Sequence, residues 1–280
     1  MKIAQKLAVS YLRTKFKLLS SISKKRAAEK ALELFRTPQS RNKKELPKIF
    51  EEAEKLQFDF RGVTIRGYRW NKNAGRKALI IHGFESSVIN FDRYIKPLTG
   101  KGYELLAFDA QAHGRSGGKM ISAPEYAGMI REVYDRFGPV HSFMAHSFGC
   151  LALVLALENI RHDENCRIVL IAPATESTTA ADTFMRFLKL DDEVRKEFDN
   201  EIMKMGGRPL EWYSISRAIK NIKAKILWLH DEDDDITPLA DALKVKEENF
   251  PNVEFVITKG LGHRRIYRDI KVSKLITDFM

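Results

Sequence analysis

Residues 140–157 read VHSFMAHSFGCLALVLAL, and this stretch decides the fold. The apolar run before Ser147 predicts a buried strand and the run after it predicts a buried helix, so the serine lies on the turn between them. A strand that breaks this sharply into a helix needs small residues two positions before and after the turn, and Ala145 and Gly149 meet that need. Such a turn lifts the hydroxyl out of the sheet beside a helix N-terminus, which makes Ser147 a candidate nucleophile.

A serine nucleophile needs a general base, a carboxylate that orients the base, and N–H donors for the oxyanion. The candidate base is His263, on a glycine-flanked loop directly after the predicted strand at 253–258. The carboxylate is expected in the acidic run 231–235, which directly follows another predicted strand. The resulting order of Ser, Asp and His along the chain is the order of the α/β-hydrolase arrangement.

Two further segments make the sequence similar to the α/β-hydrolase superfamily over about residues 58–280. Residues 80–84 (IIHGF) look like the family's His-Gly strand end, which helps to form the oxyanion hole. Residues 109–116 (DAQAHGRS) look like its Asp-x-x-Gly-His-Gly-x-Ser loop. The pattern resembles most the serine-aminopeptidase or lysophospholipase-like branch. Three residues stand where the family has glycine, namely Ala112, Ala145 and Asp231.

The resemblance implies roles for particular residues. Alignment on His230 and Pro238 selects Asp234 as the carboxylate that orients the base. Backbone N–H groups of Phe84 and Phe148 would hold the oxyanion. Together with Ser147 and His263 as nucleophile and base, these residues form the expected catalytic site.

The implied activity is that of a serine hydrolase that cleaves a small-molecule, ester-like acyl substrate, as a carboxylesterase or a lysophospholipase-like enzyme does. A thioesterase or an aminoacyl peptidase on the same machinery is the alternative enzyme. An inactive hydrolase-fold binding protein is the alternative from another class. We expect no cofactor and no metal: the acidic run 231–235 does not continue as a calcium loop, because Ile236 and Ala242 stand where glycine and glutamate would be needed.

The expected fold class is α/β, with a mostly parallel central sheet flanked by helices. A glycine-containing hairpin at 58–70 opens the domain, and apolar strands then alternate with segments of helix length. Ligands of such sheets bind at the carboxyl ends of the strands, where all the candidate residues fall. The predicted strands are at 77–81, 103–108, 140–145, 167–171, 224–229 and 253–258.

Residues 174–223 are too long for a simple crossover between two strands, and they contain two helical patterns. We expect a small helical cap, with Phe184 and Phe187 lining an apolar acyl pocket. An ordinary crossover with extra helices is the alternative. His146, at the open position of the serine turn, either touches substrate or packs.

Residues 1–57 are expected to form a helical extension outside the hydrolase domain at 58–280. The first 28 residues carry eight Lys and Arg but no Asp or Glu, and their apolar residues recur at near-helical spacing. This basic amphipathic helix either packs on the domain, contacts an anionic membrane or serves as a targeting peptide. The apolar positions are Ile3, Leu7, Tyr11, Leu18 and Ile22.

Composition limits the class of protein, its compartment and its partners. Of the 280 residues, 44% are hydrophobic and 30% are charged, which is ordinary for a globular protein. The two cysteines favour a reducing compartment, so we expect a cytoplasmic protein, with membrane association as the open alternative. Most of the net charge of +11 belongs to the first helix and no recognition module accompanies it, so nucleic-acid binding is not expected. The sequence does not determine the oligomeric state.

Overall fold

The structure is a computed structural model that describes residues 3–42 and 44–280, with side chains from Leu7 onward. The chain divides into two compact units. Unit 1 consists of Met1–Thr37 and Glu176–Tyr213, and unit 2 consists of Pro38–Thr175 and Ser214–Met280. Among the described residues, no helix is long and apolar enough to cross a membrane.

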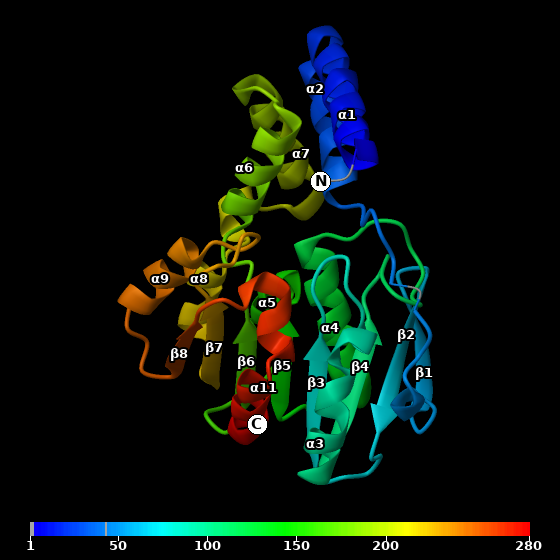
Figure 1. Cartoon of the computed structure of the whole chain (residues 1–280), viewed down its shortest axis with the longest axis vertical. Coiled ribbons are helices and arrows are strands. Elements are labelled where there is room, and N and C mark those ends of the chain that lie inside the picture. The colour runs from blue at the N-terminus through cyan, green and yellow to red at the C-terminus, as the bar shows by residue number, and fades with distance from the viewer. Residues whose placement is uncertain (1–2, 43) are drawn as a thin grey trace. The chain divides into compact units, whose positions relative to one another are not determined.

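Unit 2 is built on a sheet of eight strands within the described residues, in the order β1-β2-β4-β3-β5-β6-β7-β8 (Figure 1). Strands β1 and β2 form an antiparallel hairpin, and β2 is also antiparallel to β4. All other neighbouring strands are parallel. The strands are β1 (Glu54–Phe60), β2 (Val63–Trp70), β3 (Arg76–Ile81), β4 (Tyr103–Asp109), β5 (Ser142–His146), β6 (Arg167–Ile171), β7 (Lys225–Asp231) and β8 (Val253–Thr258).

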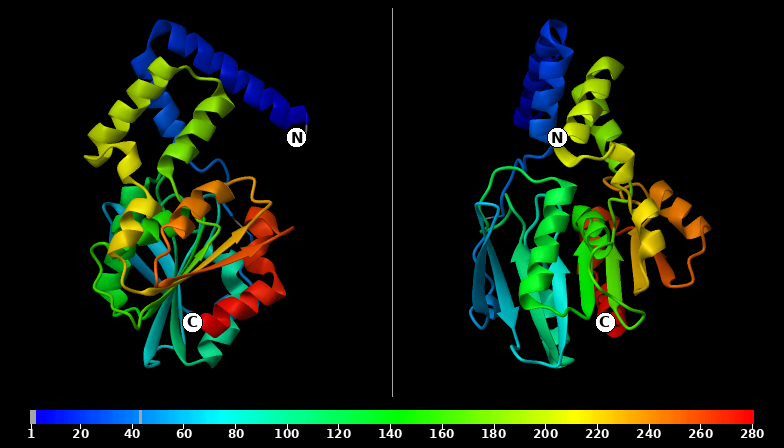
Figure 2. Two further views of the ribbon diagram at one scale, coloured as in Figure 1. Left: turned by 90° about the vertical axis from the view of Figure 1, so that its left-hand side faces the viewer. Right: turned by 180° about the vertical axis from the view of Figure 1, so that it is seen from behind.

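Helices cover both faces of this sheet (Figure 2). Alternate residues of the central strands point to opposite faces, and both sets are apolar, so strands such as β3 read as continuous apolar runs. Met144 and Val169 join the core cluster that contains α11, while their neighbours Phe143 and Ile168 are buried on the other side. The helices are α3 (Ile95–Gly100), α4 (Ala123–Phe137), α5 (Phe148–Leu157), α8 (Ile215–Ala218), α9 (Leu239–Glu247), α10 (Gly262–Arg265) and α11 (Ile270–Phe279).

The expected α/β class, with a mostly parallel sheet between helices, is therefore confirmed. The predicted strands differ from the observed ones by only a few residues at their ends. Residues 38–57, which were expected in the N-terminal extension, belong instead to unit 2. The reason is Phe50, whose buried ring packs edge-on against Tyr68 and Trp70 of β2.

Unit 1 combines the N-terminal helices with the helices of the predicted cap. Its helices are α1 (Ile3–Ile22), α2 (Lys24–Phe35), α6 (Ser177–Leu188) and α7 (Asp192–Gly206). Ala27, Ala28 and Ala31 give α2 a smooth buried face, which lets it pack closely on α7. At the end of α2, the ring of Phe35 lies 5.1 Å from that of Phe184 and 5.6 Å from that of Phe198. The extension and the insertion, expected as separate pieces, thus share one core.

The shared aromatic core predicts that α2 and α7 lose stability together. Phe198→Ala should cost about 3–5 kcal/mol of local stability, because Phe198 is fully buried. Phe35→Ala should have a similar but smaller effect, and the double variant should lose less than the sum, because the two rings contact each other. Amide hydrogen exchange in both helices measures the loss.

Met203→Ala, at an exposed position of α7, is the control and should leave exchange unchanged. Faster exchange in α2 alone after Phe35→Ala, with α7 unaffected, would contradict a common core.

Candidate active site

Ser147 lies where β5 ends and α5 begins, as its sequence context predicts. Its backbone has φ 56° and ψ −124°, a conformation that residues other than glycine rarely adopt. Strain of this kind persists only where the surrounding structure enforces it, and it is found mostly at functional sites. The turn places Ser147 at the carboxyl edge of the parallel strands.

Two glycines make this turn sterically feasible. A Cβ atom on Gly149 would lie 2.4 Å from the carbonyl oxygen of His82, so α5 can start here only without a side chain at that position. A Cβ atom on Gly83 would lie 2.9 Å from the Cβ atom of Ser147. The start of α5 is therefore packed directly against the residues that follow β3, and this contact requires glycine at positions 83 and 149.

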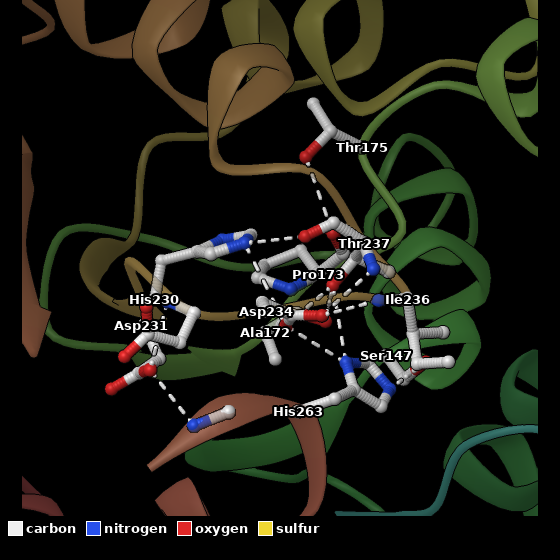
Figure 3. A network of polar contacts seen from close by, with 12 residues as sticks. Ser147, Ala172, Pro173, Thr175, His230, Asp231, Asp234, Ile236, Thr237 and His263 are labelled. Atoms are coloured by element: carbon white, nitrogen blue, oxygen red, sulfur yellow. Dashed lines mark hydrogen bonds and ion pairs between the residues drawn. The ribbon is translucent and has the colours of Figure 1, made fainter. Parts of the chain in front are cut away.

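Ser147, His263 and Asp234 form a continuous hydrogen-bonded chain (Figure 3). The Oγ atom of Ser147 is 2.9 Å from Nε2 of His263, and Nδ1 of His263 is 2.9 Å from Oδ2 of Asp234. Because an ionised carboxylate can only accept, Nδ1 donates to Asp234 and leaves Nε2 to accept the serine proton. The Asp234 side chain is fully buried, and Ser147 is 8% exposed.

Asp234 is held in its ionised form by its surroundings. Burial favours a higher pKa, but the hydrogen bond and charge of His263, together with backbone N–H donors, outweigh it and lower the pKa of Asp234. Its Oδ1 accepts from the N–H groups of Ile236 and Thr237 at 2.9 and 2.8 Å. The hydroxyl of Thr237 donates to Oδ2 at 2.9 Å. Sequence reasoning missed Thr237, whose only signal was its place just before the proline of the motif.

The neighbouring carboxylates of the acidic run have other positions. Asp233 accepts the N–H of Gly260 at 2.9 Å, and Asp235 is exposed. Within 3–42 and 44–280, no group of three or more His, Cys, Asp or Glu side chains is arranged to hold a metal ion.

His146 packs against the base and is buried. Its ring centroid is 4.7 Å from that of His263, and its Nε2 donates to the carbonyl oxygen of His263 at 3.0 Å. Burial, with the nearby His263 adding to it, lowers the pKa of His146 to about 3, so the ring is neutral. Of the two roles expected for His146, the structure shows packing, and a contact with substrate stays a prediction.

The segments expected to form the oxyanion hole meet beside Ser147. Phe84 follows Gly83 at the end of β3, and Phe148 is the first residue of α5, where a backbone N–H has no acceptor within the helix. Their rings contact edge-on with centroids 5.8 Å apart. The two N–H groups thus come from segments that border the serine, and their action on an oxyanion stays a prediction.

Two buried histidines support the Phe84 segment. Nε2 of His82 accepts the N–H of Ala110 at 2.9 Å, and Nε2 of His113 accepts the N–H of Glu85 at 3.0 Å. Burial lowers the pKa of His82 to about 4 and that of His113 to about 3, so both rings are neutral acceptors. Both histidines therefore hold backbone segments in place as structural acceptors.

Phe184 and Phe187 both find partners inside unit 1. Phe184 packs between Phe35 and Phe198, while the guanidinium of Arg13 lies over the ring of Phe187 and donates to its carbonyl oxygen. Phe184 is thus a half-buried residue that packs within the helical unit. A role of either ring in substrate binding stays a prediction.

Asp231 holds the loop that carries His263, and sequence reasoning missed this role. Its carboxylate accepts the N–H groups of Leu261 at 3.1 Å and of Gly262 at 2.8 Å. It also accepts the hydroxyl of Thr258 at 2.7 Å and the N–H of Asp233 at 3.1 Å. The aspartate in place of the family's glycine therefore ties the end of β7 to the base loop. Its only signal was the departure from the family pattern.

The buried carboxylate of Asp231 predicts a stability cost on neutralisation. Asp231→Asn should lower the free energy of unfolding by about 1–3 kcal/mol, because the amide cannot accept all these bonds. Burial alone would raise the pKa of Asp231, but the bonds from Thr258 and the backbone N–H groups together lower it. A lowered pKa means that the contribution is present above the ordinary value near 3.8 and is lost as the pH falls through the folded-state pKa.

Urea denaturation between pH 2 and 7 checks this expectation. The variant should be less stable than the parent at pH 7, and the difference should shrink at the acid end. Asp235→Asn, at an exposed position, is the matched control. Equal losses at pH 7 and pH 2 would show that Asp231 acts through its shape and not through its charge.

Comparisons with known proteins agree with this architecture. The model of the family "serine aminopeptidase, S33" matches residues 73–200, which is less than half of the chain. The uncharacterized protein YqkD of Bacillus subtilis is 24% identical over 242 residues, which cover 78% of this chain and 76% of that protein.

Solved structures show the same fold. An esterase of Pyrococcus furiosus is similar with a TM-score of 0.64 and 20% identity, over 87% of this chain and 95% of that one. A thioesterase domain from the curacin biosynthetic pathway has a TM-score of 0.59 and 14% identity, over 81% of this chain and 98% of that one. With its sheet order and its strained serine turn, the chain has the α/β-hydrolase fold.

Proposed function

We propose that the protein is a serine hydrolase that cleaves an ester-like acyl substrate through an acyl-enzyme. The observation that carries the proposal is the chain of two 2.9 Å hydrogen bonds from Ser147 through His263 to Asp234, on a backbone turn that is strained at the serine. Nucleophile, base and orienting group lie within the distances that this chemistry needs.

In the proposed reaction, Oγ of Ser147 attacks the substrate carbonyl while Nε2 of His263 takes its proton. Asp234 holds the imidazole in the tautomer with the proton on Nδ1 and stabilises the imidazolium that forms. The N–H groups of Phe84 and Phe148 bind the oxyanion. His263 then returns the proton to the leaving group, and a water molecule, activated by the same histidine, releases the acid.

An ester is the preferred substrate, as a carboxylesterase or lysophospholipase-like enzyme would use. The Pyrococcus furiosus neighbour named as an esterase supports this choice. The curacin thioesterase domain and the aminopeptidase family model keep a thioesterase and an aminoacyl peptidase as the second candidates. Turnover across acyl esters, thioesters and peptide amides separates the three.

We also propose that the protein works in the cytoplasm. Cys150 and Cys166 are both free and buried. Burial raises the pKa of Cys150 well above its ordinary value and that of Cys166 to about 12, so neither thiol is a reactive nucleophile. Unpaired thiols fit a reducing compartment.

Removal of the serine hydroxyl tests whether the protein is an enzyme at all. Ser147→Ala should lose turnover by several orders of magnitude and should no longer be labelled by a fluorophosphonate probe. Ser147→Gly should be equally inactive but more stable than Ser147→Ala by about 1 kcal/mol, because glycine adopts a positive φ without strain. A parent protein that neither reacts with the probe nor hydrolyses any acyl substrate would support the inactive binding protein instead.

The acidic run offers a matched set of variants for the orienting carboxylate. Asp234→Asn should lower kcat by about 10⁴, because the amide stabilises the wrong tautomer of His263. Asp233→Asn and Asp235→Asn remove the same charge nearby but no contact to the imidazole, and they should stay within about tenfold of the parent. A larger loss in either control than in Asp234→Asn would reassign the acid.

A further inference from the structure

Helix α1 carries two apolar faces, and only one of them is used inside unit 1. Phe16 is buried on the inner face, between the partly buried Leu12 and Leu19. The outer face carries four large side chains that are exposed to solvent. They are Leu7 (66% exposed), Tyr11 (68%), Leu18 (62%) and Ile22 (75%).

These four residues form one continuous stripe. At 3.6 residues per turn, their positions fall within about 60° of the helix circumference. Phe16 lies on the opposite side, which explains why packing inside unit 1 leaves the stripe uncovered. Single exposed apolar residues are ordinary on a protein surface, but a row of four on one helix face marks an interaction site.

Cations surround this stripe. Lys15 and Lys17 are exposed on its two sides, and Lys25 and Arg26 are exposed where α2 begins. None of these four forms an ion pair with the part of the chain that the structure describes. Two other basic residues are already engaged inside unit 1: Arg13 with Phe187, and Lys24 with Asp191 and Glu193.

Lys2 and the side chains of Ile3 and Lys6 lie outside the described residues. From Leu7 to Ala28 the sequence contains no acidic residue. The first acids of α2 are Glu29 and Glu33, and Glu33 forms its ion pair with Lys30. On α7, Asp191 and Glu193 at the start of the helix bind Lys24, and on α2 the charge of Lys15 acts on the already paired Glu33.

We propose that α1 docks unit 1 onto an anionic lipid bilayer. The stripe from Leu7 to Ile22 enters the boundary between headgroups and acyl chains, while Lys15, Lys17 and the cations at the start of α2 contact the anionic headgroups. Charge selects this occupant over a second copy of the chain, because pairing two stripes would bring two strongly basic segments together. In this arrangement α1 lies in the plane of the membrane, and no helix needs to span the bilayer.

The proposal predicts that an electrostatic and an apolar contribution to vesicle binding can be separated. The full-length protein should float with vesicles of phosphatidylglycerol and phosphatidylcholine, and it should not float with vesicles of phosphatidylcholine alone. Lys15→Gln and Lys17→Gln should each weaken binding about fivefold, and salt should remove this effect. Leu18→Ser and Tyr11→Ser should each weaken binding about tenfold at all salt concentrations, because the apolar term is not screened.

Helix α11 supplies matched controls, since Ile270 is 81% exposed and Lys271 beside it is exposed. Ile270→Ser and Lys271→Gln should leave vesicle binding unchanged, and all these exposed substitutions should leave the melting temperature unchanged. Ser147→Ala should bind as the parent does, which keeps this test independent of catalysis.

Three outcomes would overturn the proposal. One is full-length protein that ignores anionic vesicles at low salt. Another is an equal loss of binding in the α11 variants. The last is self-association in sedimentation velocity that Leu18→Ser abolishes while vesicle binding is absent, which would make the stripe a contact between copies of the chain.

Discussion

The arrangement of the site depends on one steric constraint, the close approach of the start of α5 to the end of β3. There is no space for a side chain at Gly149 against the carbonyl oxygen of His82, nor at Gly83 against Ser147. With the helix this close to the strand, the chain can pass from β5 into α5 only through a residue with a positive φ, and Ser147 occupies that position. The same contact brings the Phe84 segment to the serine, so one packing requirement fixes both the nucleophile and the place where an oxyanion would form.

The base reaches Ser147 because β5, β6, β7 and β8 are adjacent parallel strands whose carboxyl ends share one edge. Two carboxylates of the acidic run 231–235 then position different parts of the base. Asp234 faces the imidazole of His263, whereas Asp231 binds the backbone that leads into that residue. Both have a lowered pKa despite burial, since each accepts several hydrogen bonds. Orientation of a catalytic ring thus needs support for its main chain as well as for its side chain.

The sheet and the chain of Ser147, His263 and Asp234 could be predicted because their signals are local. Apolar runs mark strands that are buried on both faces, and functional residues follow such strands directly. The roles of Asp231 and His146 could not be predicted in this way, because they depend on contacts with a loop at residues 258–263, far away in the sequence. The same limit applies to Phe184, which packs within unit 1 because Phe35 lies against it. Apolar periodicity shows that a helix has a face to cover, but it does not identify the partner.

In helix α1, too, apolar periodicity does not identify what each face of the helix contacts. Its sequence has apolar residues around much of its circumference, so periodicity alone could assign it either to the protein interior or to a membrane surface. The structure separates the two sets: the face with Phe16 is covered within unit 1, and the face with Leu18 is not. Packing and surface binding, which the sequence presents as alternatives, are therefore compatible on one helix. Because the uncovered face belongs to unit 1 and the nucleophile to unit 2, residues that govern attachment and residues that govern chemistry can be changed independently.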